Sequence, residues 1–236
     1  MEGPAGLFSL SGRIACVTGA SSGLGRRAAS VLAEAGAAVV GVARRGDALE
    51  DWAEQPGGRR VALSCDLGDE AAIEPFCEAV CELFGTPDIL VHAAGVNPRK
   101  AADEVTREDW RMTQWLNLSV PFFICQRLVP QMKVKGWGRI VHFASLQTTR
   151  AFPAGIAYGT SKGGVGQMTR AMAAPMSGRL TRGRRLSSIS IKAAPRRRSF
   201  CRCPDPFDIR MEIVPLLTWG ADRVCGPSRL NSAFFI

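Results

Sequence analysis

The stretch that decides the fold is Arg13-Ile14-Ala15-Cys16-Val17-Thr18-Gly19-Ala20-Ser21-Ser22-Gly23-Leu24-Gly25. It opens with a short apolar run, passes through a turn with three glycines, and leads into an amphipathic segment that Gly36 ends. Glycines allow the backbone to turn sharply directly after a strand. This order of strand, glycine-rich turn and helix is the first unit expected of a parallel sheet with helices on both faces.

Short apolar runs and longer amphipathic segments keep alternating up to about residue 174. The expected strands are 13–18, 37–43, 60–65, 88–92 and 139–143, and the expected helices are 24–35, 70–84, 107–135 and 158–174. Runs this apolar are typical of strands that are buried on both faces. We therefore predict an α/β fold, a Rossmann-type doubly wound parallel sheet, in a single domain over residues 1–174.

The chain changes character at Pro175, a residue that ends or kinks a helix. Residues 1–174 hold 18 basic and 17 acidic side chains, whereas residues 175–236 hold 12 basic and 4 acidic ones. A short strand is expected within 186–194 and another element within 209–219, and the rest of 175–236 is predicted to be a basic, partly disordered tail. The balanced body gives no electrostatic reason to expect nucleic-acid binding, and the arginines of the tail lack interleaved aromatic residues.

The cysteine and terminal patterns favour a cytoplasmic protein. Eight cysteines are scattered along the chain without the dense spacing of a disulfide framework. No Lys or Arg precedes Arg13, so a secretory signal is not expected, and no apolar stretch is long enough to span a bilayer. Cys201 and Cys203 have no second cysteine pair nearby, so we expect no metal site.

The glycine spacing of the first turn indicates a phosphate-bearing ligand. A Gly-x-x-x-Gly-x-Gly turn lets the backbone approach a pyrophosphate, whose charge is met by N–H groups at the helix start. The turn differs from a P-loop, which ends in Gly-Lys-Ser/Thr, and an ordinary Gly/Ser turn is the alternative interpretation. The residues expected to contact a dinucleotide are Gly19, Ser21, Ser22, Gly23, Leu24 and Gly25.

The end of the second strand favours NADP(H). NAD-binding folds usually place a carboxylate there for the adenosine ribose, but this chain has Arg44 and Arg45. Arg44 offers a cation for a 2′-phosphate, although both arginines could also be solvated loop residues. Asp66, after the third strand, is placed to accept from the adenine amino group or to lie beside a helix N-cap.

Tyr158, the only tyrosine of the chain, precedes Lys162 by four residues and follows Ser145 by thirteen. Positions four apart share one face of a helix. A phenol has a pKa of about 10, and a nearby cation lowers that pKa by stabilising the phenolate. The pair therefore indicates a proton donor and acceptor, with coincidental spacing as the alternative.

Taken together, residues 7 to about 174 resemble the short-chain dehydrogenase/reductase family. The motifs that carry the resemblance are the turn 18–25, Asp66, the segment His92-Ala93-Ala94-Gly95, Asn117, Ser145 and the Tyr158/Lys162 pair. The resemblance implies an NAD(P)-dependent enzyme that transfers a hydride between a nicotinamide and a carbonyl or secondary alcohol. It also implies a homo-oligomer, a dimer or tetramer, that packs through helices 107–135 and 158–174.

The same resemblance assigns catalytic roles. It implies that Tyr158 is the general acid/base, while Lys162 lowers the pKa of Tyr158 and holds the nicotinamide ribose. Ser145 would hydrogen-bond the substrate oxygen, and Asn117 would hold a water of the proton relay. The further cofactor contacts implied are Leu67, Ala93, Ala94 and Gly95, with NADP(H) preferred and NAD(H) possible.

Three features depart from the family pattern. His92 and His142 stand where many relatives have asparagine, and His142 is interpreted as a core histidine. Relatives continue past position 175 with a strand ending in Pro-Gly, a substrate lid and a final strand, which are expected to be lacking here. The unmatched tail suggests a reading-frame shift or an alternative splice near codon 175.

Two substrate classes and one alternative function follow from the resemblance. Arg99 or Lys100, at the carboxyl edge of the sheet, could receive a carboxylate of a sugar-acid substrate, or they could be solvated. A 3-oxoacyl thioester is the other candidate substrate. The alternative function is a truncated, catalytically weak relative that binds dinucleotide or dimerises with a full-length partner.

Overall fold

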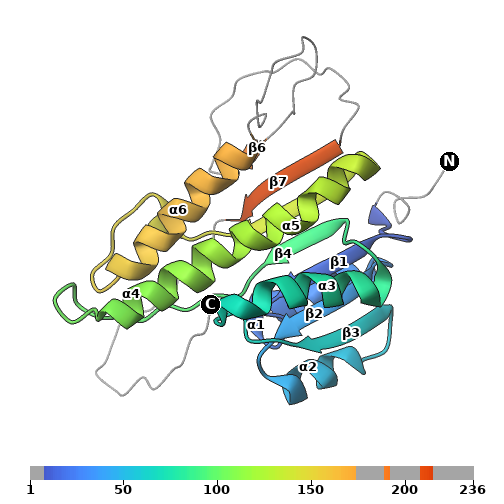
Figure 1. The fold of residues 1–236 in the computed structure, drawn as a ribbon, viewed down its shortest axis with the longest axis horizontal. Helices are drawn as coiled ribbons and strands as arrows, with labels where there is room; N and C mark the ends of the chain where they lie inside the picture. Colours follow the sequence, from blue (N-terminus) through green and yellow to red (C-terminus); the bar gives the residue numbers. More distant parts are fainter. Residues whose placement is uncertain (1–7, 174–188, 192–207, 215–236) are drawn as a thin grey trace, which may run out of the picture.

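A sheet of seven parallel strands runs through the protein in a computed structural model that describes residues 8–173, 189–191 and 208–214 (Figure 1). The strands are β1 (Ile14–Thr18), β2 (Ala38–Ala43), β3 (Arg59–Ser64), β4 (Ile89–His92), β5 (Trp137–Phe143), β6 (Ile189–Ile191) and β7 (Asp208–Val214). Their order across the sheet is β3-β2-β1-β4-β5-β7-β6. The first five follow the Rossmann order, so the predicted fold class is confirmed.

Six α-helices cover the sheet. They are α1 (Gly23–Glu34), α2 (Gly46–Ala53), α3 (Ile73–Phe84), α4 (Arg107–Gln114), α5 (Val120–Lys135) and α6 (Ile156–Ala173). Short 3-10 turns, η2 (Glu70–Ala72) and η4 (Leu146–Thr148), precede α3 and follow β5, and a π-helical turn, η3 (Trp115–Ser119), joins α4 to α5. The range 107–135, where one or two helices were expected, therefore holds two α-helices joined by the π-helical turn that contains Asn117.

Each face of the sheet has its own apolar core. On one face, α3 and α5 pack Phe76, Ile124 and Met132 against strand residues such as Leu90 and Ile140. On the other face, α1 and α2 pack the residues Ala29, Ala33, Leu49 and Trp52 against Val17, Val39 and Val91. Two cores of this kind are the packing expected of a doubly wound sheet.

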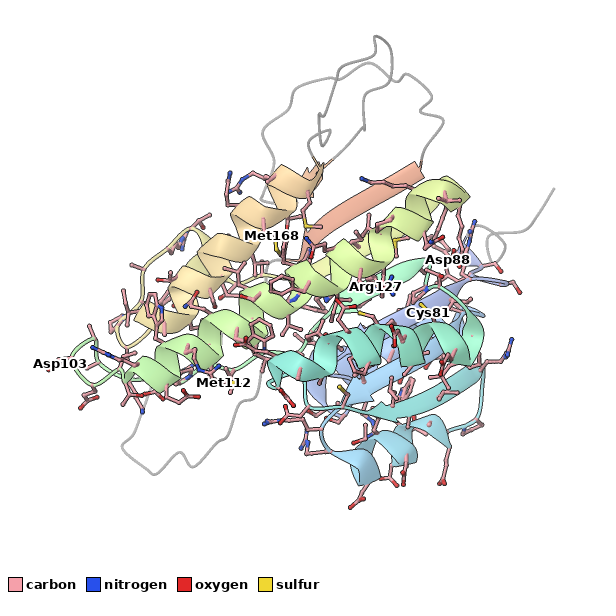
Figure 2. All side chains as sticks on the ribbon, viewed as in Figure 1. Cys81, Asp88, Asp103, Met112, Arg127 and Met168 are labelled. Carbon is pink, nitrogen blue, oxygen red and sulfur yellow. The ribbon has the colours of Figure 1, made fainter. Side chains whose placement is uncertain are left out.

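Ion pairs tie the covering helices together at the surface. Arg127 of α5 lies 3.2 Å from a carboxylate oxygen of Glu74 and 3.8 Å from one of Glu78, both on α3 (Figure 2). At the amino edge of the sheet, the buried Asp88 accepts from the Ile14 N–H at 3.0 Å and pairs with Lys135 at 3.1 Å. No helix in the described ranges combines the length and apolar character needed to cross a membrane.

The sheet continues past β5, contrary to the expectation that its last strands are lacking. β7 pairs in parallel with the whole of β5, from Trp137 opposite Asp208 to Phe143 opposite Val214, and β6 pairs with β7. β6 lies within 186–194, where a short strand was expected, and β7 overlaps 209–219, where an element of unspecified type was expected. An unpaired edge leaves backbone donors and acceptors without partners, which explains why β5 gains a neighbour. The expected lid and the rest of 175–236 lie outside the described residues.

The sequence gives no signal for α2, which no prediction included. Its eight residues hold Leu49 and Trp52, whose side chains are fully buried beneath β2 and β3. Gly41 of β2 accommodates this packing, because a Cβ there would lie 2.5 Å from the Trp52 ring. An eight-residue helix with only two apolar anchors is too short for its periodicity to be distinctive.

Candidate active site

The glycine turn after β1 is shaped by two close backbone contacts. Gly19 has a φ of +74°, and a Cβ on it would lie 2.7 Å from the Ala94 nitrogen. A Cβ on Gly25 would lie 2.3 Å from the Gly19 oxygen. Gly19 therefore allows the turn to pass against the loop after β4, while Gly25 allows α1 to begin directly under the turn.

The start of α1 fits a pyrophosphate. Ser22 occupies the N-cap position without a side-chain cap hydrogen bond, and the first turn of the helix contains no acidic residue. The backbone N–H groups at a helix start need acceptors, and the helix dipole favours an anion there. The predicted cofactor residues 19–25 thus form a helix start, at the carboxyl end of the first parallel strand, of the kind that can hold an anion.

A second cation, which sequence reasoning passed over, reaches this turn. The Arg45 guanidinium donates to the Ser21 hydroxyl at 3.0 Å and to the Ser22 hydroxyl at 2.7 Å. The predicted residue, Arg44, instead lies 3.8 Å from Asp66 in an exposed ion pair. The doublet was visible in the sequence, but only the fold shows which arginine bends toward the glycine turn.

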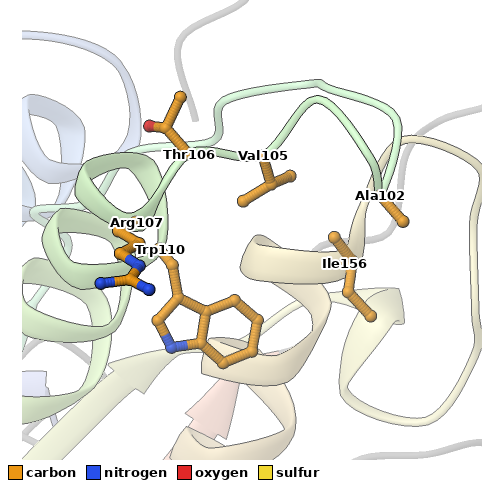
Figure 3. Close-up of a pocket in the computed structure, with 6 residues that line it drawn as sticks. All are labelled: Ala102, Val105, Thr106, Arg107, Trp110 and Ile156. Carbon is orange, nitrogen blue, oxygen red and sulfur yellow. The ribbon is translucent and has the colours of Figure 1, made fainter.

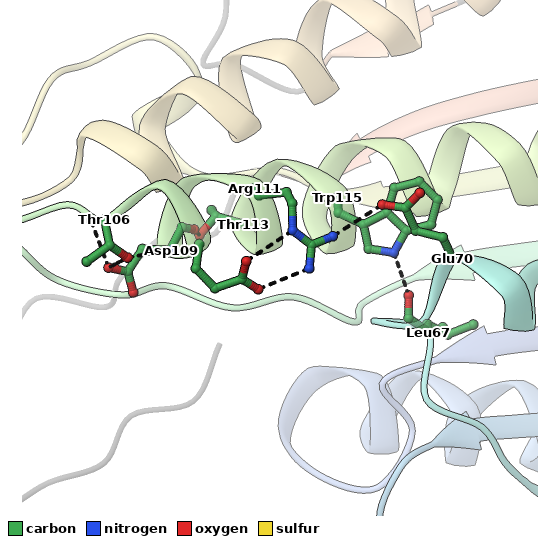
Figure 4. Close-up of polar contacts among 8 residues, drawn as sticks. Leu67, Glu70, Thr106, Asp109, Arg111, Thr113 and Trp115 are labelled. Atoms are coloured by element: carbon green, nitrogen blue, oxygen red, sulfur yellow. Dashed lines mark hydrogen bonds and ion pairs between the residues drawn. The ribbon is translucent and has the colours of Figure 1, made fainter.

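The residues after β3 are anchored to α4 and to the π-helical turn η3 that follows it. Asp66 accepts from the Gly68 N–H at 2.9 Å. The buried Leu67 offers its carbonyl oxygen to the indole N–H of Trp115, in η3, at 3.0 Å (Figure 4). Arg111 of α4 lies 3.2 Å from Glu70 (Figure 4). These contacts fix the height of Asp66 and Leu67 above the sheet, on the same carboxyl edge as the glycine turn.

Tyr158 and Lys162 lie on one face of α6 and are both buried, with 4% and 7% of their surfaces exposed. The Lys162 ammonium donates to the Phe143 carbonyl oxygen at 2.7 Å and lies 5.5 Å from the centre of the Tyr158 ring. Burial lowers the pKa of Lys162 to about 8. Phe143 ends β5 two residues before Ser145, so one sheet end brings together all three predicted residues.

The pKa of Tyr158 differs from the expectation. Burial raises this pKa above its ordinary value, and the groups that oppose the rise are the Ser145 hydroxyl and the charge of Arg99. Lys162 was expected to lower the pKa of Tyr158, but its ammonium is turned to the Phe143 carbonyl. Desolvation of the phenol therefore outweighs its polar neighbours in the protein without ligands.

Asn117 lies in the π-helical turn, and its side chain locks the loop after β4. Its amide oxygen accepts from the Val96 N–H at 2.8 Å, and its amide nitrogen donates to the Val96 carbonyl at 2.9 Å. The same nitrogen donates to the Ser161 hydroxyl at 3.0 Å, and Ser161 in turn donates to the Tyr158 carbonyl at 2.7 Å. Asn117 thus connects the predicted cofactor loop to the helix of Tyr158.

The loop Ala93-Ala94-Gly95 completes the edge. The Ala94 N–H donates to the Thr18 hydroxyl at 3.3 Å, which ties this loop to the end of β1. A Cβ on Gly95 would lie 2.9 Å from the Asn117 amide oxygen, so glycine is needed for that packing. Thr18 and Ser161 were not predicted as site residues, because a hydroxyl that supports a neighbour leaves no spacing signal in a single sequence.

The site as a whole defines a dinucleotide-dependent oxidoreductase: an anion-binding helix start, and a buried Tyr-Lys pair beside a serine at the carboxyl edge of one parallel sheet. A family model described as short chain dehydrogenase matches residues 13–181. The chain belongs to the short-chain dehydrogenase/reductase family, whose members are NAD(P)-dependent enzymes.

Individual relatives agree with this assignment. The chain is 39% identical over 186 residues to D-threitol dehydrogenase of Mycolicibacterium smegmatis, a match that covers 78% of this chain and 70% of that protein. It is 35% identical over 170 residues to gluconate 5-dehydrogenase of Gluconobacter oxydans, covering 71% and 66%. A metagenomic short-chain oxidoreductase solved with NADP superimposes with a TM-score of 0.67 at 32% identity, covering 70% of this chain and 76% of that one.

Proposed function

We propose that the protein is an NADP(H)-dependent oxidoreductase that interconverts a carbonyl compound and a secondary alcohol. The observation that carries the proposal is the Tyr158-Lys162 pair, buried on one helix beside Ser145. In the test, NADPH oxidation by the purified chain is followed with a panel of keto acids, ketoses and 3-oxoacyl thioesters, and NADP⁺ reduction is followed with polyols, beside a Tyr158→Phe control. Turnover that disappears in the control supports the proposal, and equal turnover in both proteins contradicts it.

The side chains divide the work as follows. Tyr158 donates a proton to the substrate oxygen during reduction, and Ser145, which hydrogen-bonds the Tyr158 hydroxyl, orients that oxygen. Lys162, held by the Phe143 carbonyl, presents the charge that stabilises the phenolate left after proton transfer. The dinucleotide, when bound along residues 19–25, Arg44, Asp66 and Leu67, supplies the hydride. Asn117 keeps the Val96 loop and α6 in register.

The preference for NADP(H) rests on the two arginines after β2. Arg44 and Arg45 stand where NAD-binding folds usually place a carboxylate for the ribose diol. The Arg45 guanidinium already donates to the hydroxyls of Ser21 and Ser22. A guanidinium fixed at this place can meet a 2′-phosphate with charge-assisted hydrogen bonds. Steady-state kinetics with NADPH and NADH compare the two cofactors directly, and a lower KM for NADH would contradict the preference.

An anionic substrate such as a sugar acid is favoured by the difference between Arg99 and Lys100. Lys100 is paired with Asp109 at 2.6 Å, whereas Arg99 has no ion pair among the described residues. The charge of Arg99 reaches Tyr158, because it lowers the pKa of that phenol. A substrate carboxylate on Arg99 would therefore lie next to the proton donor. A 3-oxoacyl thioester places no carboxylate beside its ketone, so the substrate panel separates the two classes.

We further propose that the chain forms a homo-oligomer through α4, α5 and α6. Four large apolar side chains on these helices are 38–49% exposed, namely Trp110, Phe122, Phe123 and Ile156. Trp110 and Ile156 also line a hollow of about 370 Å³ together with Ala102 and Val105 (Figure 3). Exposed apolar surface of this kind is typical of an interface. Light scattering of the purified protein tests the proposal, and a monomer at micromolar concentration would contradict it.

A catalytically weak relative is the second candidate. The family match ends at residue 181, and the alignments with D-threitol dehydrogenase and gluconate 5-dehydrogenase cover 70% and 66% of those proteins. The end of the match supports a catalytic domain at 1–174 followed by an atypical tail, 175–236, whose strands β6 and β7 extend the same sheet. NADPH binding measured by fluorescence, without turnover on any substrate of the panel, would favour this second candidate.

Five free cysteines in the described part are consistent with a cytoplasmic location, which fractionation of the source cells would test.

A further inference from the structure

Two histidines and a cysteine meet in the core below the catalytic edge of the sheet. His92 ends β4, His142 lies opposite it in β5 as its register partner, and Cys125 comes from α5, which covers this face (Figure 1). All three side chains are buried, with exposed fractions of 4% for His92, 1% for His142 and 0% for Cys125. None of them has a role in the proton transfer proposed for Tyr158.

The geometry brings three ligand atoms to one place. The Cys125 sulfur lies 3.4 Å from His92 Nε2, and one ligand atom from each of the three residues lies within 4.8 Å of the other two. The imidazole rings stack with their centres 4.8 Å apart and their planes 12° apart. Bonds of about 2.0–2.3 Å to one ion need donor atoms roughly 3.5–4 Å apart, so small side-chain rotations would close the set.

Several polar atoms of this cluster lack hydrogen-bond partners among the described residues. Both ring nitrogens of His142 and Nδ1 of His92 have no hydrogen-bond partner among the described residues. A neutral imidazole always carries one N–H donor, and a buried donor without a partner costs about 1–3 kcal/mol. The surrounding core is apolar, with Leu90, Ile124 and Ile140 nearby in the same cluster. A metal ion in the cluster would use the lone pair of one ring nitrogen of each histidine, which no protein donor in the described part uses at His142.

We propose that His92, Cys125 and His142 form a buried site for a soft monovalent ion, copper(I). One thiolate and two neutral imidazoles around Cu⁺ carry no net charge, which an apolar core tolerates. Zn²⁺ would leave a net positive charge in the core and lack a fourth ligand. On binding, the sulfur–copper bond replaces the sulfur–hydrogen bond of Cys125, the thiol proton leaves to solvent, and no electron is transferred.

A metal ion at this site would link the strands β4 and β5 to the helix α5. His92 directly precedes Ala93 of the proposed cofactor loop, and His142 lies three residues before Ser145. A metal bond between them would hold the ends of β4 and β5 and the middle of α5 at fixed distances. We therefore expect copper(I) to raise the Tm of the purified protein, because a ligand that binds only the folded state stabilises that state.

The test is a titration of the full chain with copper(I) under anaerobic, reducing conditions against a chromogenic copper(I) chelator. The expected result is one tightly bound equivalent with a raised Tm, and at least about a tenfold loss of affinity in Cys125→Ala and His142→Asn. Cys81→Ala, which changes a half-buried cysteine on α3, is the matched control and should bind like the unchanged chain.

X-ray absorption of the copper-loaded unchanged chain keeps the test independent of variant folding, and it should report one sulfur and two imidazole nitrogens. Equal affinity in Cys125→Ala and the unchanged chain, or a copper shell of sulfur atoms alone, would overturn the proposal. Tighter binding of Zn²⁺ than of copper(I) in the same competition would overturn the charge argument on which it rests.

Discussion

The Lys162 ammonium lies 2.7 Å from the carbonyl oxygen of Phe143, the last residue of β5. This hydrogen bond anchors a buried charge to the strand end that carries Ser145. It is the one hydrogen bond from Lys162 among the described residues, so most of the hydration that the charge loses on folding is not replaced. The buried charge of Lys162 therefore lowers the stability of the folded protein, and the loss can be measured as a change in the free energy of unfolding.

We expect Lys162→Met to remove turnover and to raise the free energy of unfolding at pH 7 by about 1–3 kcal/mol. Burial lowers the pKa of Lys162 from 10.5 to about 8, so the folded state disfavours its charged form. Loss of the bond to Phe143 offsets part of the gain. Urea unfolding measures the change, and a less stable variant would contradict it.

The same shift predicts how stability depends on pH. The folded protein loses the Lys162 proton near pH 8, whereas the unfolded chain keeps it until about 10.5. Between these values the unfolded state binds more protons, so the contribution of Lys162 to stability rises with pH. Lys162→Met should lack this rise when the two unfolding curves are compared at pH 7.5 and 9.5. Parallel curves would show that the lysine is not the group responsible.

Tyr158 can be titrated alone, because the chain has no other tyrosine. We expect its pKa in the protein without dinucleotide to exceed about 10, since burial outweighs the two groups that lower it. Ser145→Ala and Arg99→Ala should each raise this pKa further. Ultraviolet titration of tyrosinate measures all three proteins, with Lys100→Ala as the control. A value below 10 would mean that the phenol is better solvated than described.

Arg45→Ala should raise the KM for NADPH about 10–100-fold and leave the KM for NADH within about threefold. The Arg45 guanidinium is held by two serine hydroxyls, so its position is fixed before a 2′-phosphate arrives. Arg44→Ala should have a smaller effect, because Arg44 is exposed and shared with Asp66. Arg27→Ala, on the outer surface of α1, serves as the control. Equal losses for both cofactors would point to a structural role instead.

Asn117→Ala should lower the free energy of unfolding by about 2–4 kcal/mol, because it leaves the Val96 N–H and carbonyl without partners in a partly buried loop. Asn97→Ala is the matched control. The Asn97 amide oxygen is buried without a hydrogen-bond partner, so its removal should change stability by less than about 1 kcal/mol. Denaturant curves of the two variants decide the matter, and similar losses would contradict the bridging role of Asn117.

The sequence was sufficient for the fold class and for the helical spacing that puts Tyr158 and Lys162 on one face of α6, because both depend on local signals. A glycine turn after an apolar strand and a Tyr-Lys pair at helical spacing need no knowledge of distant residues. The choice between Arg44 and Arg45 could not be predicted, since it depends on a side chain crossing to Ser21 and Ser22 from another element. The stacking of His92 on His142 likewise requires the register of β4 and β5.

The tail shows where local reasoning fails for another reason. Charged and apolar residues alternate from Asp208 to Ile213, as expected of a strand, and residues 208–214 form β7, which pairs with the whole of β5. The expectation of a sheet that lacks its last strands came from a missing Pro-Gly motif, which concerns ligand closure more than strand pairing. The absence of that one motif therefore did not imply the absence of the strands β6 and β7.

The pairing of β5 with β7 determines when the sheet can be completed during synthesis. Trp137 meets Asp208 across about seventy residues of intervening chain, so the ribosome must add that length before the pair can close. Until then β5 is the unpaired edge strand of a sheet that consists of β1 to β5. Such an edge can pair with extended segments of other chains. The nascent protein thus passes through a period in which this sheet edge is open, and slower translation of residues 144–207 would lengthen that period.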